Sequence, residues 1–182
     1  MKDAKTKLLI FLFITIFLSS TLIALGTSSP KNLYSEVLKD GGNSHLKLLT
    51  VPFISQKKLY CSEASATMIL HYYGQNKITQ EYVHENISIN FEKMLPPLTR
   101  YLDCSYEALR IEGLKREINE GDPIMIRLLI GEVRHTVVVV GYKTESVIIH
   151  DPERGKNLKM SYETLLNHWI PVNSGHMSIT FN

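Results

Sequence analysis

The sequence predicts an α+β fold, in which helices occupy the first part of the domain and an antiparallel β-sheet the second. An apolar stripe with helical spacing runs through residues 61–74. Runs rich in β-branched residues, separated by Gly or charged turns, follow at residues 124–130, 135–142, 146–151 and 177–181. Because the two patterns are segregated along the chain and do not alternate, the α+β class is favoured over a βαβ arrangement.

The size and composition of the chain are those of one ordinary globular domain. It has 182 residues, of which 44% are hydrophobic and 21% charged, and its formal net charge is +2. The sequence contains no run of Lys and Arg interleaved with aromatic residues, so we expect no nucleic-acid partner. We expect the domain to be monomeric.

Residues 1–26 have the layout of a secretory signal peptide. A basic start, "MKDAKTK", precedes an apolar core, and the small residues Ala24 and Gly26 suit cleavage after Gly26. The apolar run Leu8–Leu25 spans 18 residues, so an uncleaved N-terminal membrane anchor is the alternative. Under both interpretations the protein is secreted or extracytoplasmic, with membrane attachment through residues 8–25 if this segment is retained.

Residues 27–47 are rich in Ser, Gly, Asn and Lys and show no sustained periodicity. We predict that they form a linker or pro-segment and that the folded domain occupies residues 48–182. The pair Gly41–Gly42 in "LKDGGNSH" makes self-cleavage at this point a further hypothesis.

The stretch "YCSEASATMILHYYG" predicts a helix that begins at Cys61 and ends before Gly74. A cysteine at a helix N-terminus is favoured as the thiolate, its nucleophilic form, because the helix dipole and free N–H groups stabilise negative charge. One alternative is a small buried apolar residue. Another is one half of a Cys61–Cys104 disulfide, which an exported protein can keep.

The rest of the chain contains weaker helical patterns. Residues 79–120 are predicted to be helical or loop-like, with Pro96 and Pro97 breaking the helices. The stretch "EGLKREINEGDP" predicts a helix that ends at Gly121, and "SYETLLNHW" predicts a short helix between the last two strands.

A nucleophilic cysteine needs a base, and His135 is the candidate, with Asp151 as the carboxylate that orients it. If residues 143–145 form a three-residue hairpin loop, Tyr142 pairs with Ser146. In this register Asp151 lies opposite the residue two positions after His135, so the two are diagonal neighbours on one face. A loop one residue longer would send Asp151 to the other face.

Gln56 is the candidate for stabilising an oxyanion. It precedes Cys61 by five residues, in the loop that leads into the helix. Its side-chain amide and the Cys61 backbone N–H could converge on a developing negative charge, whereas a solvated loop glutamine is the alternative. The sequence contains no HExxH or CxxC spacing and no glycine-rich phosphate loop, so we expect no metal and no cofactor.

Taken together, these stretches resemble the papain-like cysteine peptidases. The closer resemblance is to the bacteriocin-processing (double-glycine leader) peptidases and their free-standing secreted relatives. It rests on an ordered set of stretches over about residues 48–181: "VPFISQ", "YCSEAS", "LHYYG", "INEGDPIMI", "HTVVVVGYKTESVIIHDPERG" and "SYETLLNHW".

The resemblance implies a papain-like fold, with the nucleophile helix packed on an antiparallel sheet, and a peptide or protein substrate. It implies Cys61 as nucleophile, His135 as base, Asp151 as orienter and Gln56 as oxyanion donor. One departure is Ser62, because the family often has Gly after the cysteine. No exporter sequence accompanies the domain within the 182 residues, so a double-glycine leader is not implied as the substrate.

The sequence therefore predicts an exported cysteine peptidase that cleaves peptide bonds. One alternative is a non-catalytic peptide-binding module on the same fold, which a Cys61–Cys104 bridge would favour. Another is an acyl transferase that uses the same Cys-His-Asp triad.

Overall fold

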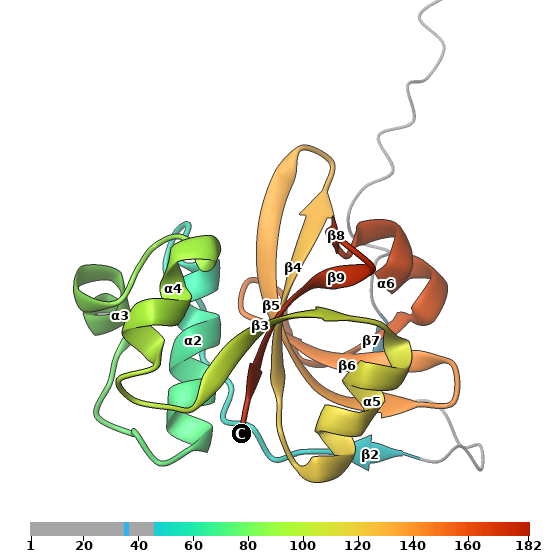
Figure 1. Cartoon of the computed structure of the whole chain (residues 1–182), viewed down its shortest axis with the longest axis horizontal. Helices are drawn as coiled ribbons and strands as arrows, with labels where there is room; N and C mark the ends of the chain where they lie inside the picture. Colours follow the sequence, from blue (N-terminus) through green and yellow to red (C-terminus); the bar gives the residue numbers. More distant parts are fainter. Residues whose placement is uncertain (1–34, 37–45) are drawn as a thin grey trace, which may run out of the picture. The chain divides into compact units, whose positions relative to one another are not determined.

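An antiparallel β-sheet with helices on both faces organises the structure (Figure 1). The computed structural model describes residues 35–36 and 46–182. The expected signal peptide or anchor at residues 1–26 and the self-cleavage hypothesis at Gly41–Gly42 lie outside the described residues, as does most of the linker or pro-segment at 27–47. The proposed domain boundaries stay a prediction.

Over the described residues, the strand order in the sheet is β1-β7-β6-β5-β4-β9-β3, with β2 added to β5 and β8 to β9, and the pairings are antiparallel. The strands are β1 (Ser35–Glu36), β2 (Lys47–Leu48), β3 (Cys104–Leu109), β4 (Ile124–Ile130), β5 (Val133–Lys143), β6 (Ser146–Asp151), β7 (Gly155–Ser161), β8 (Pro171–Val172) and β9 (Gly175–Phe181). The helices are α2 (Cys61–Tyr72), α3 (Gln80–Asn86), α4 (Phe91–Leu98), α5 (Ile111–Glu120) and α6 (Tyr162–His168).

Each face of the sheet has its own apolar core. Helices α2, α3 and α4 pack on one face, around buried side chains such as Met68, Val83 and Phe91. Helices α5 and α6 cover the other face with residues such as Leu114 and Leu165, and Figure 1 shows the two groups of helices on opposite sides of the strands. This arrangement confirms the predicted α+β class, with the nucleophile helix packed on an antiparallel sheet.

Helix α2 is buried from Ser62 to Leu70. It begins at Cys61, as predicted, and it ends where Gly74 takes a left-handed conformation (φ +87) and donates its N–H to the carbonyl of His71 at 3.0 Å. Small alanine and serine side chains in its first turns let this end of the helix lie close to β5. The cysteine is thereby held where the helix meets the sheet.

The prediction for residues 79–120 is wrong about β3, which is a strand. This strand lies at the edge of the sheet and buries its two end residues, Cys104 and Leu109, while its middle is largely accessible. The stretch "CSYEAL" consequently lacks the strict alternation of apolar and polar residues from which strands are predicted.

The same prediction is wrong about the prolines, because Pro96 and Pro97 lie inside α4. The buried side chains of Phe91, Met94 and Leu98 anchor this short helix in the core, and packing thereby outweighs the two backbone hydrogen bonds that the prolines cannot donate. The predicted end of α5 at Gly121 (φ +108) and the predicted short helix in "SYETLLNHW", which is α6, are confirmed.

The hairpin between β5 and β6 differs from the predicted one but gives the predicted register near the end of β6. Lys143 pairs with Ser146, so the loop has two residues and the three-residue loop is wrong. A β-bulge between Val139 and Gly141 then shifts the pairing by one residue, and Val138 lies opposite His150, as expected. The bulge thus compensates for the shorter loop.

Glycine is required at the bulge because β2 approaches β5 closely there. A Cβ atom on residue 141 would collide with the carbonyl oxygen of Lys47. Beyond Leu48 the chain stays on β5, since the Leu49 N–H donates to the Val140 carbonyl at 2.8 Å. Within residues 35–36 and 46–182, no helix is long and apolar enough to span a membrane.

Candidate active site

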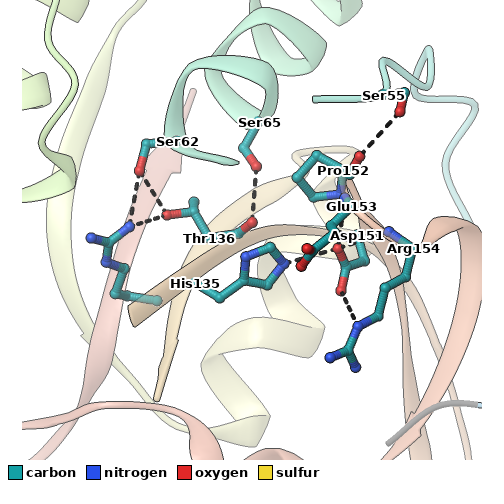
Figure 2. A network of polar contacts seen from close by, with 10 residues as sticks. Ser55, Ser62, Ser65, His135, Thr136, Asp151, Pro152, Glu153 and Arg154 are labelled. Atoms are coloured by element: carbon teal, nitrogen blue, oxygen red, sulfur yellow. Dashed lines mark hydrogen bonds and ion pairs between the residues drawn. The ribbon is translucent and has the colours of Figure 1, made fainter. Parts of the chain in front are cut away.

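The first turn of α2 lies beside a stretch of β5 that β6 does not cover. Strand β6 pairs with β5 from Val138 onward, so among residues 35–36 and 46–182 no strand covers the earlier residues of β5 on that edge. The Ser62 Oγ lies 2.9 Å from Thr136 Oγ1, and the Ser65 Oγ donates to the Thr136 carbonyl at 3.3 Å (Figure 2). Cys61 is half-buried at this junction.

Strands β5 and β6 bring His135 and Asp151 together. The His135 Nε2 lies 2.8 Å from Asp151 Oδ1 (Figure 2). Because an ionised carboxylate only accepts hydrogen bonds, Nε2 carries a proton, and Nδ1 is the ring atom that remains for Cys61. The same Oδ1 accepts the backbone N–H groups of Glu153 (2.9 Å) and Arg154 (3.2 Å), which fixes the carboxylate.

The pKa of the Cys61 thiol is lowered to about 7 by its surroundings. Burial by itself raises this pKa, but the hydrogen bond with His135, the hydrogen bond with the Thr136 backbone and the charges on His135 and Arg127 outweigh it. The helix adds to this effect, because the N-cap residue Tyr60 provides no side-chain hydrogen bond to the free N–H groups of the first turn.

The pKa of His135 is raised to about 9, although burial by itself lowers it. The hydrogen bonds to Asp151 and Cys61, and the negative charges of both partners, hold the second proton on the ring. Cys61 therefore ionises at a lower pH than His135. Between about pH 7 and about pH 9 the pair exists as thiolate and imidazolium.

Gln56 lies in the loop before α2, and this loop is tied to the end of β6. The Gln56 backbone N–H donates to the Pro152 carbonyl at 2.8 Å, and the Ser55 Oγ donates to the same oxygen at 3.4 Å. The Gln56 Oε1 is buried and has no hydrogen-bond partner among the described residues. If the side-chain amide is rotated by 180°, its Nε2 takes the position of Oε1. An N–H group without a partner in this position can donate a hydrogen bond to an oxyanion that forms during a reaction.

Between Gln56 and Cys61 the chain makes a tight turn. Leu59 adopts a left-handed backbone conformation there (φ +67), which a leucine rarely takes, and its side chain is 82% exposed. Such a conformation persists only where the neighbouring structure holds it. The packing around the turn, and not the conformational preference of Leu59, therefore holds the backbone between the loop and the helix.

Helix α3 supports the loop from its other side. The Gln80 Nε2 donates to the Ser55 carbonyl at 3.1 Å. The His84 Nδ1 lies 2.8 Å from the Glu63 carboxylate, and the His84 ring stacks on Tyr60 with the ring centroids 4.5 Å apart. These contacts join segments 25 and 21 residues apart, so no local pattern in the sequence marks them.

The second cysteine lies apart from this chemistry. Cys61 and Cys104 are both free thiols, so the disulfide alternative is wrong. Cys104 is buried in the core that α2, α3 and α4 share with the sheet, and burial together with the charge of Asp103 raises its pKa to about 11. Among the residues that the structure describes, no group of three His, Cys, Asp or Glu side chains could hold a metal ion.

The match with known proteins agrees with this geometry. Residues 48–177 match the family model described as "Peptidase_C39 like family". The chain belongs to this family. It is therefore a cysteine-peptidase-like protein, and the predicted family and fold are both confirmed. No curated protein matches the sequence.

Solved structures share the fold of this Peptidase C39-like chain at low sequence identity. A protein described as a C39-like peptidase from Bacillus anthracis is 20% identical with a TM-score of 0.64, covering 76% of this chain and 98% of that one. A double glycine motif protease from an AMS/PCAT transporter, in complex with the leader peptide, is 25% identical with a TM-score of 0.58, covering 74% and 93%. The peptidase domain of Streptococcus ComA, a bifunctional ABC transporter, is 18% identical with a TM-score of 0.59, covering 75% and 98%.

Proposed function

We propose that this chain is an exported cysteine peptidase. In this proposal Cys61 is the nucleophile, His135 the acid and base, Asp151 the carboxylate that orients the ring and Gln56 the side-chain oxyanion donor. The observation that carries it is the His135–Asp151 hydrogen bond next to Cys61, where the pKa of the thiol is lowered and that of the ring is raised. Membership of a peptidase family supports the same function.

The first half of the proposed reaction makes an acyl-enzyme. The Cys61 thiolate attacks the carbonyl carbon of a peptide bond, and the carbonyl oxygen becomes an oxyanion that accepts hydrogen bonds from Gln56 and the Cys61 backbone N–H. The His135 imidazolium then gives its Nδ1 proton to the leaving nitrogen as the C–N bond breaks. A thioester on Cys61 and a free amine result.

The second half regenerates the enzyme. Neutral His135 takes a proton from water while the water oxygen attacks the thioester carbon. The C–S bond breaks, a carboxylic acid leaves, and the thiolate–imidazolium pair is restored. Throughout both halves Asp151 accepts the Nε2–H hydrogen bond and holds the ring in one orientation.

The two pKa values predict a bell-shaped pH profile for kcat/KM. Activity rises through about pH 7 as Cys61 becomes the thiolate, and it falls through about pH 9 as His135 loses the proton that the leaving nitrogen needs. A continuous peptidase assay between pH 5 and pH 10 would measure both limbs. A profile that rises only near pH 8.5, the ordinary pKa of a free thiol, contradicts the proposed pair.

The direct test of the function is a peptide-library digest by the full chain and by Cys61→Ala. We expect cleavage products from the wild type and none from the variant, because the thiolate forms the acyl-enzyme. Cys104→Ala is the matched control and should cleave as the wild type does. Identical product spectra for wild type and Cys61→Ala would leave the chain as a peptide-binding module. An added amine that captures the acyl group in place of water would instead identify an acyl transferase.

Export is the second part of the proposal, and it rests on residues 1–26. N-terminal sequencing of the protein from the extracytoplasmic fraction tests it. A chain that starts at Thr27 supports signal cleavage, and an intact N-terminus in the membrane fraction supports the anchor. Recovery of the intact protein in the cytoplasm contradicts export.

A further inference from the structure

One arginine in the sheet joins the two elements that carry the candidate nucleophile and base. Arg127 lies in β4, where its neighbours along the strand are apolar. Its Nη1 lies 2.9 Å from Ser62 Oγ and 2.5 Å from Thr136 Oγ1, and the two hydroxyl oxygens lie 2.9 Å from each other. Guanidinium and hydroxyls thus form a closed triangle of hydrogen bonds.

Each of these two hydroxyls belongs to a residue that directly follows a candidate catalytic residue. Ser62 directly follows Cys61 in the first turn of α2, and Thr136 directly follows His135 in β5. Figure 2 shows the Ser62 and Thr136 side chains pointing toward one another across the space between helix and strand. A shift of the helix along the strand would break hydrogen bonds of this triangle.

The positive charge of Arg127 is not neutralised by a carboxylate within ion-pair distance among the residues that the structure describes. Its hydrogen-bond partners are neutral hydroxyls, its Nε is buried, and its guanidinium carbon lies 5.6 Å from the centre of the Phe91 ring. A charge held in partly buried surroundings acts strongly on other charges nearby. Ser62, one of its two hydrogen-bond partners, directly follows Cys61 in the chain, so the Cys61 thiolate is a negative charge on which Arg127 can act.

We propose that Arg127 is a positioning residue of this site, which locks the first turn of α2 to β5 through Ser62 and Thr136 and favours the Cys61 thiolate by its unneutralised charge. The inference rests on the proposed function for its role in catalysis, but its effect on the thiol can be measured without any substrate. The charge of Arg127 is also one of the causes that lower the pKa of Cys61. Ser62, in the place where the family often has Gly, thereby acquires a role.

The test measures the rate of alkylation of Cys61 by iodoacetamide against pH. The full chain carries Cys104→Ala, so that Cys61 is the thiol that reacts. Arg127→Met keeps most of the side-chain volume but removes the charge and the hydrogen bonds. We expect its alkylation midpoint to rise by about half to one pH unit, so that the rate at pH 7 falls about threefold or more. Arg134→Met is the matched control, because Arg134 is exposed, pairs with Glu92 and directly precedes His135; its midpoint should not move.

Two further variants separate the effect of the Arg127 charge from the effect of its hydrogen bonds to Ser62 and Thr136. Arg127→Lys keeps the charge but not the planar guanidinium whose Nη1 bonds to both hydroxyls, and Thr136→Val removes one hydroxyl at nearly constant shape. We expect both to keep the alkylation midpoint within a few tenths of a pH unit and to lower kcat while KM stays unchanged. These variants also carry the test if circular dichroism shows that Arg127→Met does not fold.

The inference is overturned if Arg127→Met, or Arg127→Lys in its place, matches Arg134→Met in both alkylation midpoint and kcat. If the wild type shows no peptidase activity, the proposed function fails. The alkylation midpoints then decide the inference by themselves: a raised midpoint in Arg127→Met supports it, and an unchanged one overturns it.

Discussion

Cys61 and Cys104 are the same chemical group in two parts of one structure, and their chemistry is opposite. Burial raises the pKa of both thiols. At Cys104 the charge of Asp103 adds to burial, and the pKa reaches about 11. At Cys61 a histidine, a backbone hydrogen bond and an arginine outweigh burial, and the pKa falls to about 7. The partners that the fold brings to the sulfur, and not its burial, decide whether a cysteine is reactive.

Two buried histidines on neighbouring strands likewise differ in their pKa because of their partners. His150 in β6 bonds to the Val51 carbonyl, and burial lowers its pKa. His135 in β5 is also buried, but it faces the Asp151 carboxylate, and its pKa is raised. The hydrogen bonds and charges of Asp151 and Cys61 thus reverse the direction of the pKa shift between two buried histidines on adjacent strands.

The largest expected difference between the two thiols is in their rate of alkylation. At pH 7 about half of Cys61 is thiolate, whereas only about 1 in 10⁴ of Cys104 is, so a short pulse of iodoacetamide should label Cys61 alone. Peptide mass spectrometry measures both sites. In concentrated guanidinium chloride the two should react at similar rates, because their environments are lost. Equal labelling of the folded protein would remove the contrast on which the proposed site depends.

Removing the histidine should raise the pKa of Cys61 and make it a slowly reacting thiol, as Cys104 is. In His135→Gln the charge and the hydrogen bond that favour the thiolate are absent, so the alkylation midpoint should rise and kcat/KM should fall about 10²- to 10⁴-fold. The alkaline limb of the pH profile near pH 9 should disappear, because it belongs to this ring. The half-exposed His168, in α6, offers the control His168→Gln, which should alter neither quantity.

Gln56 should matter for turnover and not for the thiol. Gln56→Ala removes a proposed oxyanion donor, so kcat should fall about 10²- to 10³-fold while the pH midpoint of Cys61 alkylation stays unchanged. Gln75→Ala, at an exposed position just after α2, is the matched control. A change in alkylation without a change in kcat would assign Gln56 to the structure of the loop instead.

The smallest effect is expected at Cys104, where only packing is involved. Cys104→Ala should lower the free energy of unfolding by about 1 kcal/mol and leave kcat/KM unchanged. Cys104→Ser should cost more, by about 1–3 kcal/mol, if its hydroxyl is buried without a partner. Denaturant unfolding measures both. A loss of activity in the alanine variant would mean that the second thiol has a chemical role.

The sequence predicted the parts of the site that local rules determine. The start of α2 at Cys61 and its end at Gly74 followed from helix termination. The pairing of His135 with Asp151 is also as predicted, but it is reached through a two-residue loop and a bulge in place of the predicted three-residue loop. The family is confirmed, and the roles of the four predicted residues stay predictions.

What the sequence did not predict depends on contacts between distant segments. The bulge at Gly141 follows from the close approach of β2, and the α4 prolines are tolerated because the helix packs into the core. The triangle around Arg127 joins residues 65 positions apart. The one local signal for it was a single charged residue in the apolar run "IMIRLLI", which on its own also fits an arginine at a strand edge.

The bond from the Gln56 N–H to the Pro152 carbonyl has a mechanical consequence. It ties the loop of the proposed oxyanion donor to the end of β6, the strand that carries Asp151, while the sulfur belongs to α2, beyond the turn at Leu59. A displacement of α2 relative to the sheet would therefore separate the sulfur from the ring and from the donor at once. Helix α3 contacts both the loop and α2, so its hydrogen bonds oppose such a displacement.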